Sequence, residues 1–455
     1  MGCGVSTAAT GSVPAGGAAT IGRPPLAPQL PHGCGISEWQ KRQPTCVGRI
    51  QSALTSIEQF NDALHACIEV LGEEALRIAA EADARLASGA APRALEGVPV
   101  LVKCNIDLAG SLSTAGTAGL ADWRPASDAA IVAKVLEQGA ICVAKTNMPE
   151  LALGWWGYNK LHGTCRNPLD HGATSGGSSA GTASGIAAGM APIGLGSDTM
   201  GSLRTPAECC GISGFRPSHG RYSTAGVVPL STTEDVPGPM GKTVADVAVL
   251  DALIVGEPLS TVVPANLRGL TFCVPLDWIE ELDPGTRNAL DAAVEALIAG
   301  GATVRKDLAF KPVTEYSTKA KVNFSEIELQ NYIDSHAGLT TTVDELLDAC
   351  ENPMLRPSYK EGGQGWEKVN MATKTADEAE KLQAGWEQER DAIEGMYADF
   401  FSSNGVDALL TPVHPVAPVR IEGWEDDAAY AEKGGFAPIF HWMPMAKYLV
   451  RTIYV

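Results

Sequence analysis

Two serines flanked by glycine lie within residues 173–206, a stretch rich in small residues. Ser178 belongs to the run GGSS at residues 176–179, and Ser202 follows Gly201. Glycine beside serine lets backbone N–H groups crowd a reactive hydroxyl, as a nucleophile and its oxyanion donors require. Upstream, Lys103 closes the apolar run VPVLV at residues 98–102. Two such serines with one lysine, and no obligatory histidine, favour a serine hydrolase.

The motifs around these residues resemble those of the amidase signature family. Its core motif reads approximately GGSSGG followed by (T/S)DTGGSIRxPA, and residues 176–179 and 197–207 (SDTMGSLRTPA) follow it nearly position by position. The segment LEGVPVLVK at residues 95–103 is similar to the family's LxGIPxxVKDN. The resemblance extends from about residue 50 to about residue 415. GFRPSHGRY at residues 214–222 and VPLS at residues 228–231 look most like the mandelamide and indole-acetamide hydrolase branch.

The resemblance implies a role for each residue of these motifs. Ser202 matches the family's nucleophile, and Lys103 matches its base. Ser178 matches the bridging serine, which the family joins to its predecessor, here Gly177, through a cis peptide bond. An ordinary lysine has a pKa near ~10.4, so Lys103 must be buried to be neutral at neutral pH, and the apolar residues before it favour such burial. The implied oxyanion donors are the N–H groups of Thr199, Met200, Gly201 and Ser202, with Asp198 and Arg204 as structural support.

Each residue also has a simpler interpretation. A serine after glycine is most often a turn or cap residue, and a lone lysine is usually a surface residue whose stem packs on apolar neighbours. The paired motifs favour catalysis over both. Two positions depart from the family, because Met200 and Ala180 stand where it usually has glycine. His162, His171 and His219 flank the motifs, and we expect ordinary hydrogen-bonding roles for them.

An aromatic cluster precedes the first serine motif. Trp155, Trp156 and Tyr158 match a region that lines the cleft in the resembled family. They would favour an aromatic or apolar acyl group, although packing in the core is the commoner role of tryptophan.

Composition excludes several classes of function. The formal net charge of −19 argues against nucleic acid and against an anionic membrane surface as partners. No apolar run approaches the ~18 residues of a membrane span. The eleven cysteines are scattered and no CxxC or HExxH pattern is present, so we expect reduced thiols, a cytoplasmic setting, no metal and no cofactor. The sequence is also compatible with a homodimer.

The composition of the first 36 residues differs from that of the rest of the chain, because Gly, Ala, Pro, Ser and Thr predominate. This composition predicts a disordered, low-complexity tail. Its start fits the N-myristoylation pattern at Gly2, with Cys3 available for palmitoylation, and two acyl chains together would anchor the protein to a membrane. A leader without lipidation and an organelle transit peptide are the alternatives.

Residues 37–455 are expected to form a single α/β domain, with a central mixed sheet covered by helices on both faces. Helical periodicity runs through residues 50–86, and strands at 98–102 and 141–144 bracket a helix at 128–138. A small-residue helix at 179–190, a helix at 283–300 and strands at 302–305 and 408–412 follow. Residues 312–397 are helical in pattern and, in the resembled family, cover the active-site cleft. Family members add further strands and a helix after the last strand, so the ending KYLVRTIYV at residues 447–455 predicts a truncated or rebuilt C-terminal end with open sheet edges.

The leading functional hypothesis is an amidase that hydrolyses a small carboxamide to carboxylate and ammonia through Ser202, Ser178 and Lys103. Three alternatives remain: an amidotransferase subunit that hydrolyses glutamine with a partner, a lipid amide hydrolase, and an inactive amidase-like protein.

Overall fold

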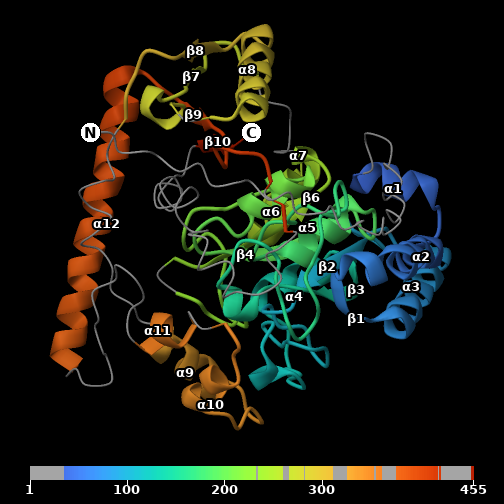
Figure 1. Ribbon diagram of the computed structural model, residues 1–455. Coiled ribbons are helices and arrows are strands. Elements are labelled where there is room, and N and C mark those ends of the chain that lie inside the picture. The colour runs from blue at the N-terminus through green and yellow to red at the C-terminus, as the bar shows by residue number, and fades with distance from the viewer. Residues whose placement is uncertain are drawn as a thin grey trace, which may run out of the picture.

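The computed structural model describes residues 35–231, 234–259, 266–280, 282–310, 325–352, 355–360, 376–418, 420–421 and 452–454. The lipidation positions Gly2 and Cys3, and most of the expected N-terminal tail, lie outside these residues. Two sheets organise the described chain, a central one of six strands and a smaller one of four (Figure 1). None of the described helices is both long enough and apolar enough to cross a membrane.

The central sheet is mixed, with strand order β1-β3-β2-β4-β6-β5. Its three inner strands β3, β2 and β4 run parallel, while β1, β6 and β5 are antiparallel to their neighbours. Parallel strands need cover on both faces, which explains why every residue of β2, β3 and β4 is buried. The strands are β1 (Cys67–Val70), β2 (Pro99–Lys103), β3 (Ile141–Thr146), β4 (Ile193–Asp198), β5 (Ser213–Gly214) and β6 (Val236–Gly241).

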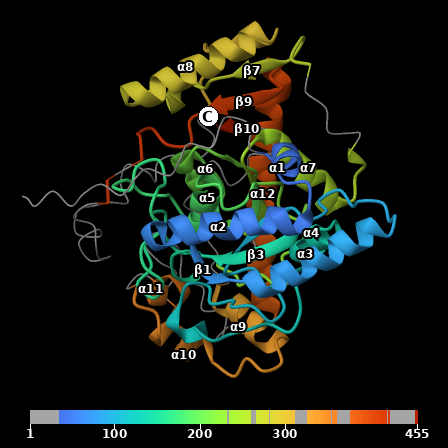
Figure 2. The same ribbon diagram turned by 90° about the vertical axis from the view of Figure 1, so that its right-hand side faces the viewer.

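Helices cover both faces of this sheet, as the sequence predicts. On one face, α2, α3, α5 and α6 pack in a core that includes Ile57, Ala79 and Leu101. On the other face, α4 and α7 pack in a core that includes Val100, Val132 and Leu250. Figure 2 shows α2 and α3 crossing in front of β1 and β3. The helices are α1 (Ile36–Arg42), α2 (Cys46–Leu64), α3 (Gly72–Ala87), α4 (Ala130–Glu137), α5 (Ala180–Ala187), α6 (Arg204–Cys210) and α7 (Val244–Val255), with 3-10 turns η1 (Ala118–Leu120) and η2 (Glu150–Ala152).

The small residues of α5 let this helix approach the sheet closely. All eight of its residues are buried. A Cβ added at Gly181 would lie 2.2 Å from the carbonyl oxygen of Ala66 and 2.5 Å from the nitrogen of Asn147. Any side chain there would push the helix away from the segment that leads into β1. The helix begins directly after Ser178 and Ser179, so its packing fixes both serines.

The helical periodicity through residues 50–86 is interrupted, which corrects the expectation of one continuous helix. Helix α2 ends at Leu64, where His65 adopts a left-handed backbone (φ 49°). Residues 67–70 then form β1 at the edge of the sheet and pair with β3. Cys67 and Ile68 fit a helical pattern, but pairing with β3 determines their conformation.

The second sheet has the order β10-β9-β7-β8 and is parallel throughout. Helix α8 packs on one side through Leu290 and Val294, and an aromatic core of Trp278, Phe310 and Tyr397 forms on the other. The pairing of β10 with β9 places residues 452–454 at a sheet edge. The elements are β7 (Thr271–Cys273), η4 (Leu276–Trp278), α8 (Pro284–Ala299), β8 (Thr303–Arg305), β9 (Ala408–Thr411) and β10 (Thr452–Tyr454).

The second sheet lies on one side of the central sheet, and a group of three helices lies on the opposite side (Figures 1 and 2). These helices are α9 (Ser325–Ser335), α10 (Val343–Asp348) and α11 (Leu355–Lys360), and the long α12 (Ala376–Asn404) follows them. Leu329, Leu346 and Leu355 share one apolar core with Cys104 and Leu230. The Tyr359 hydroxyl donates to the carbonyl of Pro229 at 3.0 Å. The helical segment expected after residue 312 therefore packs on the loops that follow β2 and precede β6.

Candidate active site

The candidate site lies at the carboxyl ends of two neighbouring parallel strands. Lys103 is the last residue of β2, and Asp198 is the last residue of β4. Ligand sites of open α/β sheets commonly form at the carboxyl ends of the strands, where the loops converge. The turn at residues 199–203 leads from β4 into α6 and carries Ser202, and the GGSS loop leads into α5. The fold therefore brings the two serine motifs and the lysine to one place.

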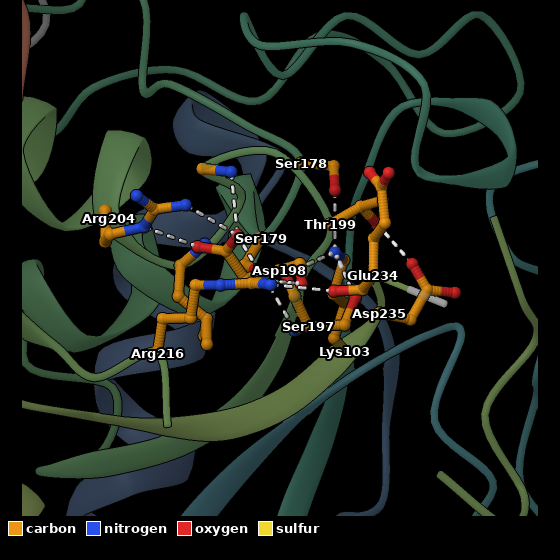
Figure 3. A network of polar contacts seen from close by, with 12 residues as sticks. Lys103, Ser178, Ser179, Ser197, Asp198, Thr199, Arg204, Arg216, Glu234 and Asp235 are labelled. Atoms are coloured by element: carbon orange, nitrogen blue, oxygen red, sulfur yellow. Dashed lines mark hydrogen bonds and ion pairs between the residues drawn. The ribbon is translucent and has the colours of Figure 1, made fainter. Parts of the chain in front are cut away.

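Lys103 is wholly buried and contacts two serine hydroxyls (Figure 3). Its Nζ donates to the Oγ of Ser178 at 2.8 Å and to the Oγ of Ser197 at 2.8 Å. Burial lowers the pKa of Lys103 to about 7, although the charge of Asp198 and that of Asp235 oppose this shift. Near neutral pH a large fraction of Lys103 is thus the neutral amine, which can accept a proton.

The loop that carries Ser178 is held by close backbone contacts. The peptide bond between Gly177 and Ser178 is cis. Gly176 has a φ of +73°, and a Cβ there would lie 2.7 Å from the Cα of Pro206 in α6. The N–H of Ser179 donates to the carbonyl of Ser202 at 3.2 Å. These contacts seat the first serine motif directly on the turn that carries the second.

The carboxylate of Asp198 organises the turn around Ser202. It accepts from the N–H of Gly201 at 2.7 Å and from the N–H of Leu203 at 3.1 Å. Arg204 and Arg216 donate to it at 2.9–3.0 Å. Burial raises the pKa of Asp198, but the two guanidinium groups outweigh burial and hold that pKa below its usual range. The ionised carboxylate therefore holds the backbone of the turn that carries Ser202.

A second layer of polar contacts lies beside the turn. Thr199 donates through its hydroxyl to Asp235, and the N–H groups of Leu230 and Ser231 donate to the same carboxylate at 2.8 and 3.0 Å. Arg216 also donates to the carbonyl of Glu234 at 2.8 Å. The segment before β6 is thereby joined to the end of β4.

The N–H groups of the turn are not equivalent. Ser202 is 4% exposed and lies among the buried residues of the turn, with Met200 partly exposed beside it. Since the N–H of Gly201 donates to Asp198, it is directed into the carboxylate cluster, whereas the sequence led us to expect it among the oxyanion donors. The group of candidate donors is therefore reduced to the N–H groups of Thr199, Met200 and Ser202.

The histidines near the motifs take other positions. His162 contacts the hydroxyl of Thr114 at 3.2 Å, and burial lowers the pKa of His162. Burial also lowers the pKa of His171, and His219 lies on the surface. The ring of Trp155 is buried and packs edge-on against that of Trp156, with 6.4 Å between ring centroids.

Sequence reasoning assigned no role to three residues that contact this site. Ser197 gives Lys103 its second hydroxyl and also accepts from the Nδ2 of Asn105 at 3.1 Å. Arg216 is the second cation on Asp198. Ser197 directly precedes Asp198, and Asn105 lies two residues after Lys103. Their position within the matched motifs was therefore the signal that could have identified them from the sequence. Arg216 lies 18 residues from Asp198, and only the pairing of β4, β6 and β5 brings it close.

A buried amine against one serine hydroxyl, beside a glycine turn that carries another serine, can move a proton while an acyl group is transferred. A fold and a site of this kind define an enzyme that hydrolyses amides. Comparison with known sequences identifies the family: residues 49–446 match the family model Amidase, and the chain belongs to that family. The resemblance of the motifs is thus confirmed.

Two curated relatives and one solved structure show the range of this family. The chain is 30% identical over 379 residues to a mandelamide hydrolase of Pseudomonas putida, covering 82% of this chain and 74% of that protein. It is 32% identical over 404 residues to a subunit of the glutamyl-tRNA(Gln) amidotransferase of Geobacter sulfurreducens, covering 85% and 82%. A crystal structure of an amidase matches with a TM-score of 0.72 and 27% identity, covering 91% of this chain and 89% of that one.

Proposed function

We propose that this protein hydrolyses a small carboxamide to a carboxylate and ammonia, with Ser202 as nucleophile, Ser178 as proton relay and Lys103 as base. The observation that carries the proposal is the contact of 2.8 Å between Ser178 Oγ and the Nζ of a wholly buried lysine. Burial moves the pKa of Lys103 to about 7, where a base is most effective at neutral pH. The similarity to mandelamide hydrolase supports a small amide as substrate.

The reaction proceeds in two stages. Neutral Lys103 takes the proton of the Ser178 hydroxyl, Ser178 takes that of Ser202, and the Ser202 oxygen attacks the amide carbon. The N–H groups of Thr199, Met200 and Ser202 stabilise the oxyanion. The relay then returns the proton to the leaving nitrogen, so that ammonia departs and an ester with Ser202 remains. Water attacks this ester by the same relay, releases the carboxylate and restores the Ser202 hydroxyl.

The test is ammonia release by the purified chain from phenylacetamide, indole-3-acetamide, mandelamide, glutamine and oleamide. Ser202→Ala serves as the inactive variant, and labelling with a fluorophosphonate probe reports the nucleophile without requiring the right substrate. We expect turnover of at least one amide and labelling of the wild type, both lost in Ser202→Ala. Turnover that persists in Ser202→Ala above a few per cent would show that another residue is the nucleophile.

The same panel separates the other candidate functions. The similarity to a subunit of an amidotransferase favours glutamine hydrolysis with a partner as the second candidate, which predicts probe labelling but no turnover by the chain alone. Turnover of oleamide would indicate a lipid amide hydrolase, and a membrane anchor formed by acylation of Gly2 and Cys3 would suit such a substrate. Absence of both labelling and turnover in folded protein would indicate an inactive member of the family.

A further inference from the structure

Asn105 lies beside the candidate base and is joined to it through one hydroxyl. The Nδ2 of Asn105 donates to the Oγ of Ser197 at 3.1 Å, and the Nζ of Lys103 contacts the same oxygen at 2.8 Å. All three side chains are buried, and Asn105 is 2% exposed. The backbone of Asn105 is held as well, because its carbonyl accepts from the N–H of Val228 at 2.9 Å. The amide is therefore fixed where it reaches the lysine through Ser197.

The two ends of the Asn105 amide are used unequally. Its nitrogen binds Ser197, whereas its oxygen Oδ1 is buried and has no hydrogen-bond partner among the residues that the structure describes. A buried acceptor without a partner is costly, and most buried polar groups in proteins have one. The site thus presents a donor to Ser197 although the acceptor of the same amide stays unsatisfied. This arrangement indicates a role for the donor beyond packing.

What the Ser197 hydroxyl can do depends on the protonation state of Lys103. Within the described part of the chain, the hydrogen-bond neighbours of Ser197 Oγ are the amide nitrogen of Asn105 and the amine of Lys103. The amide nitrogen and a charged amine can only donate, so beside a charged amine the proton of Ser197 has no acceptor. A neutral amine has a lone pair that can accept this proton. The hydrogen bond from Asn105 therefore favours the neutral amine over the charged one.

Other groups around Lys103 act in both directions. Burial lowers the pKa of Lys103, whereas Cys104 beside it in the chain, Asp198 at the end of β4 and Asp235 before β6 raise that pKa. Burial raises the pKa of the Cys104 thiol, which is therefore uncharged near neutral pH. On β3, the other neighbour of β2, the buried amine of Lys145 donates to a backbone carbonyl and to a hydroxyl. A contact that disfavours the charged amine of Lys103 thus acts with burial and against two carboxylates.

We propose that Asn105 is a positioning residue that keeps Lys103 neutral by donating to the hydroxyl of Ser197. The neutral amine is then available to take the proton of Ser178. This inference rests on the proposed amide hydrolysis by Ser202. It makes proton binding by Lys103 depend on Asn105 only while Ser197 has its hydroxyl.

The test measures kcat/KM for a neutral amide of the panel as a function of pH and compares the pH midpoints of variants. Asn105→Ala removes the donor, so its midpoint should lie about one pH unit above that of the wild type, as expected for one lost hydrogen bond. In the Ser197→Ala background, Asn105→Ala should leave the midpoint unchanged, because the hydroxyl through which the amide acts is absent. A general change of packing around Lys103 would instead shift the midpoint in both backgrounds. Asn105→Ser is the second variant, in case alanine prevents folding, and should shift the midpoint in the same direction because a hydroxyl can accept as well as donate.

Asn61→Ala is the matched control. It removes an amide that donates to the carbonyl of Cys67 at 2.9 Å and joins α2 to β1, and its midpoint should equal that of the wild type. The inference is overturned, with the proposed function intact, if both Asn105 variants keep the wild-type midpoint. It is also overturned if Asn105→Ala shifts the midpoint equally with and without the Ser197 hydroxyl.

Urea unfolding at several pH values reports proton binding by Lys103 without any substrate. The pH dependence of the free energy of unfolding should shift in Asn105→Ala by the same amount as the activity midpoint, and an unshifted dependence would contradict the inference. Lack of turnover on every amide of the panel, or turnover that survives Ser202→Ala, would remove the proposed function. The unfolding measurement would then still decide whether Asn105 controls the proton of Lys103.

Discussion

Replacing the buried lysine with methionine should remove most of the activity and yet stabilise the protein near neutral pH. Lys103 is wholly buried, and its pKa falls from the ordinary value of 10.5 to about 7 because burial disfavours the charged amine. In the unfolded chain the same amine keeps its ordinary pKa. Between these two values the unfolded state binds one proton more than the folded state, so the free energy of unfolding of the wild type rises with pH.

The size of the effect follows from this difference. One proton contributes about 1.4 kcal/mol per pH unit to the free energy of unfolding. The interval between the two pKa values, 10.5 and about 7, therefore corresponds to about 5 kcal/mol. Lys103→Met has no group that titrates there. It does lose the hydrogen bonds to Ser178 and Ser197, which contribute about 1 kcal/mol each. Near pH 7 the variant should therefore be more stable than the wild type by roughly 2–3 kcal/mol, and this advantage should vanish about two pH units higher.

The assay is urea unfolding of both proteins at several pH values between about 7 and 9, with amide hydrolysis measured in parallel. The free energy of unfolding of the wild type should gain roughly 2–3 kcal/mol on that of Lys103→Met across this range. Turnover by the variant should fall by roughly 10²–10⁴-fold, the usual contribution of a general base. A difference in stability that stays constant with pH would show that Lys103 keeps the same pKa folded and unfolded, and would refute its role as a neutral base.

Three further outcomes follow from the same geometry. The kcat/KM for a neutral amide should rise with pH and level off above about 7, because Lys103 must lose its proton in the free enzyme; a profile that falls through this range would contradict its assignment as base. Asp198→Asn leaves two buried guanidinium groups without their anion, so the free energy of unfolding by urea should fall by about 3–5 kcal/mol. Gly181→Ala puts a Cβ 2.2 Å from the carbonyl oxygen of Ala66 and should lower the free energy of unfolding by about 1–3 kcal/mol or more. Gly385→Ala in α12 is the control, because a Cβ there meets nothing within 4 Å. This variant should leave the free energy of unfolding unchanged or raise it slightly.

The sequence predicted the parts of the site that local motifs determine. The lysine at the end of a buried strand and the two serine turns are short segments whose residue types restrict their conformation, and the structure brings Lys103 and Ser178 into contact. The direction of a single N–H was beyond such reasoning. Whether Gly201 faces the substrate or Asp198 depends on where the carboxylate lies, and two arginines from different segments determine that position.

For the fold, too, the sequence predicted the elements with a local signal and missed those that depend on distant segments. Continuous apolar runs predicted β2 and β3, because parallel strands buried on both faces need apolar residues throughout. A helix was predicted across the segment that contains β1, because four residues carry too little periodic signal to compete with their helical flanks. Likewise, the second parallel sheet depends on the pairing of β7 with β9, which are more than a hundred residues apart, and a single sequence has no local signal for such a pairing.

The lysine and the aspartate of the site make opposite demands on their surroundings. The proposed role of Lys103 as base requires that its amine be buried and neutral, and this burial reduces the stability of the protein near neutral pH. Asp198, with its two guanidinium groups, requires charge and keeps it at any ordinary pH. The neutral amine and the ionised carboxylate lie at the ends of adjacent strands, so their environments must differ over a short distance. The arginines produce this difference, because they bind the carboxylate of Asp198, whereas the amine of Lys103 contacts serine hydroxyls. Removal of either arginine should therefore leave Asp198 less well neutralised and raise the pKa of Lys103, which would move the activity profile to higher pH.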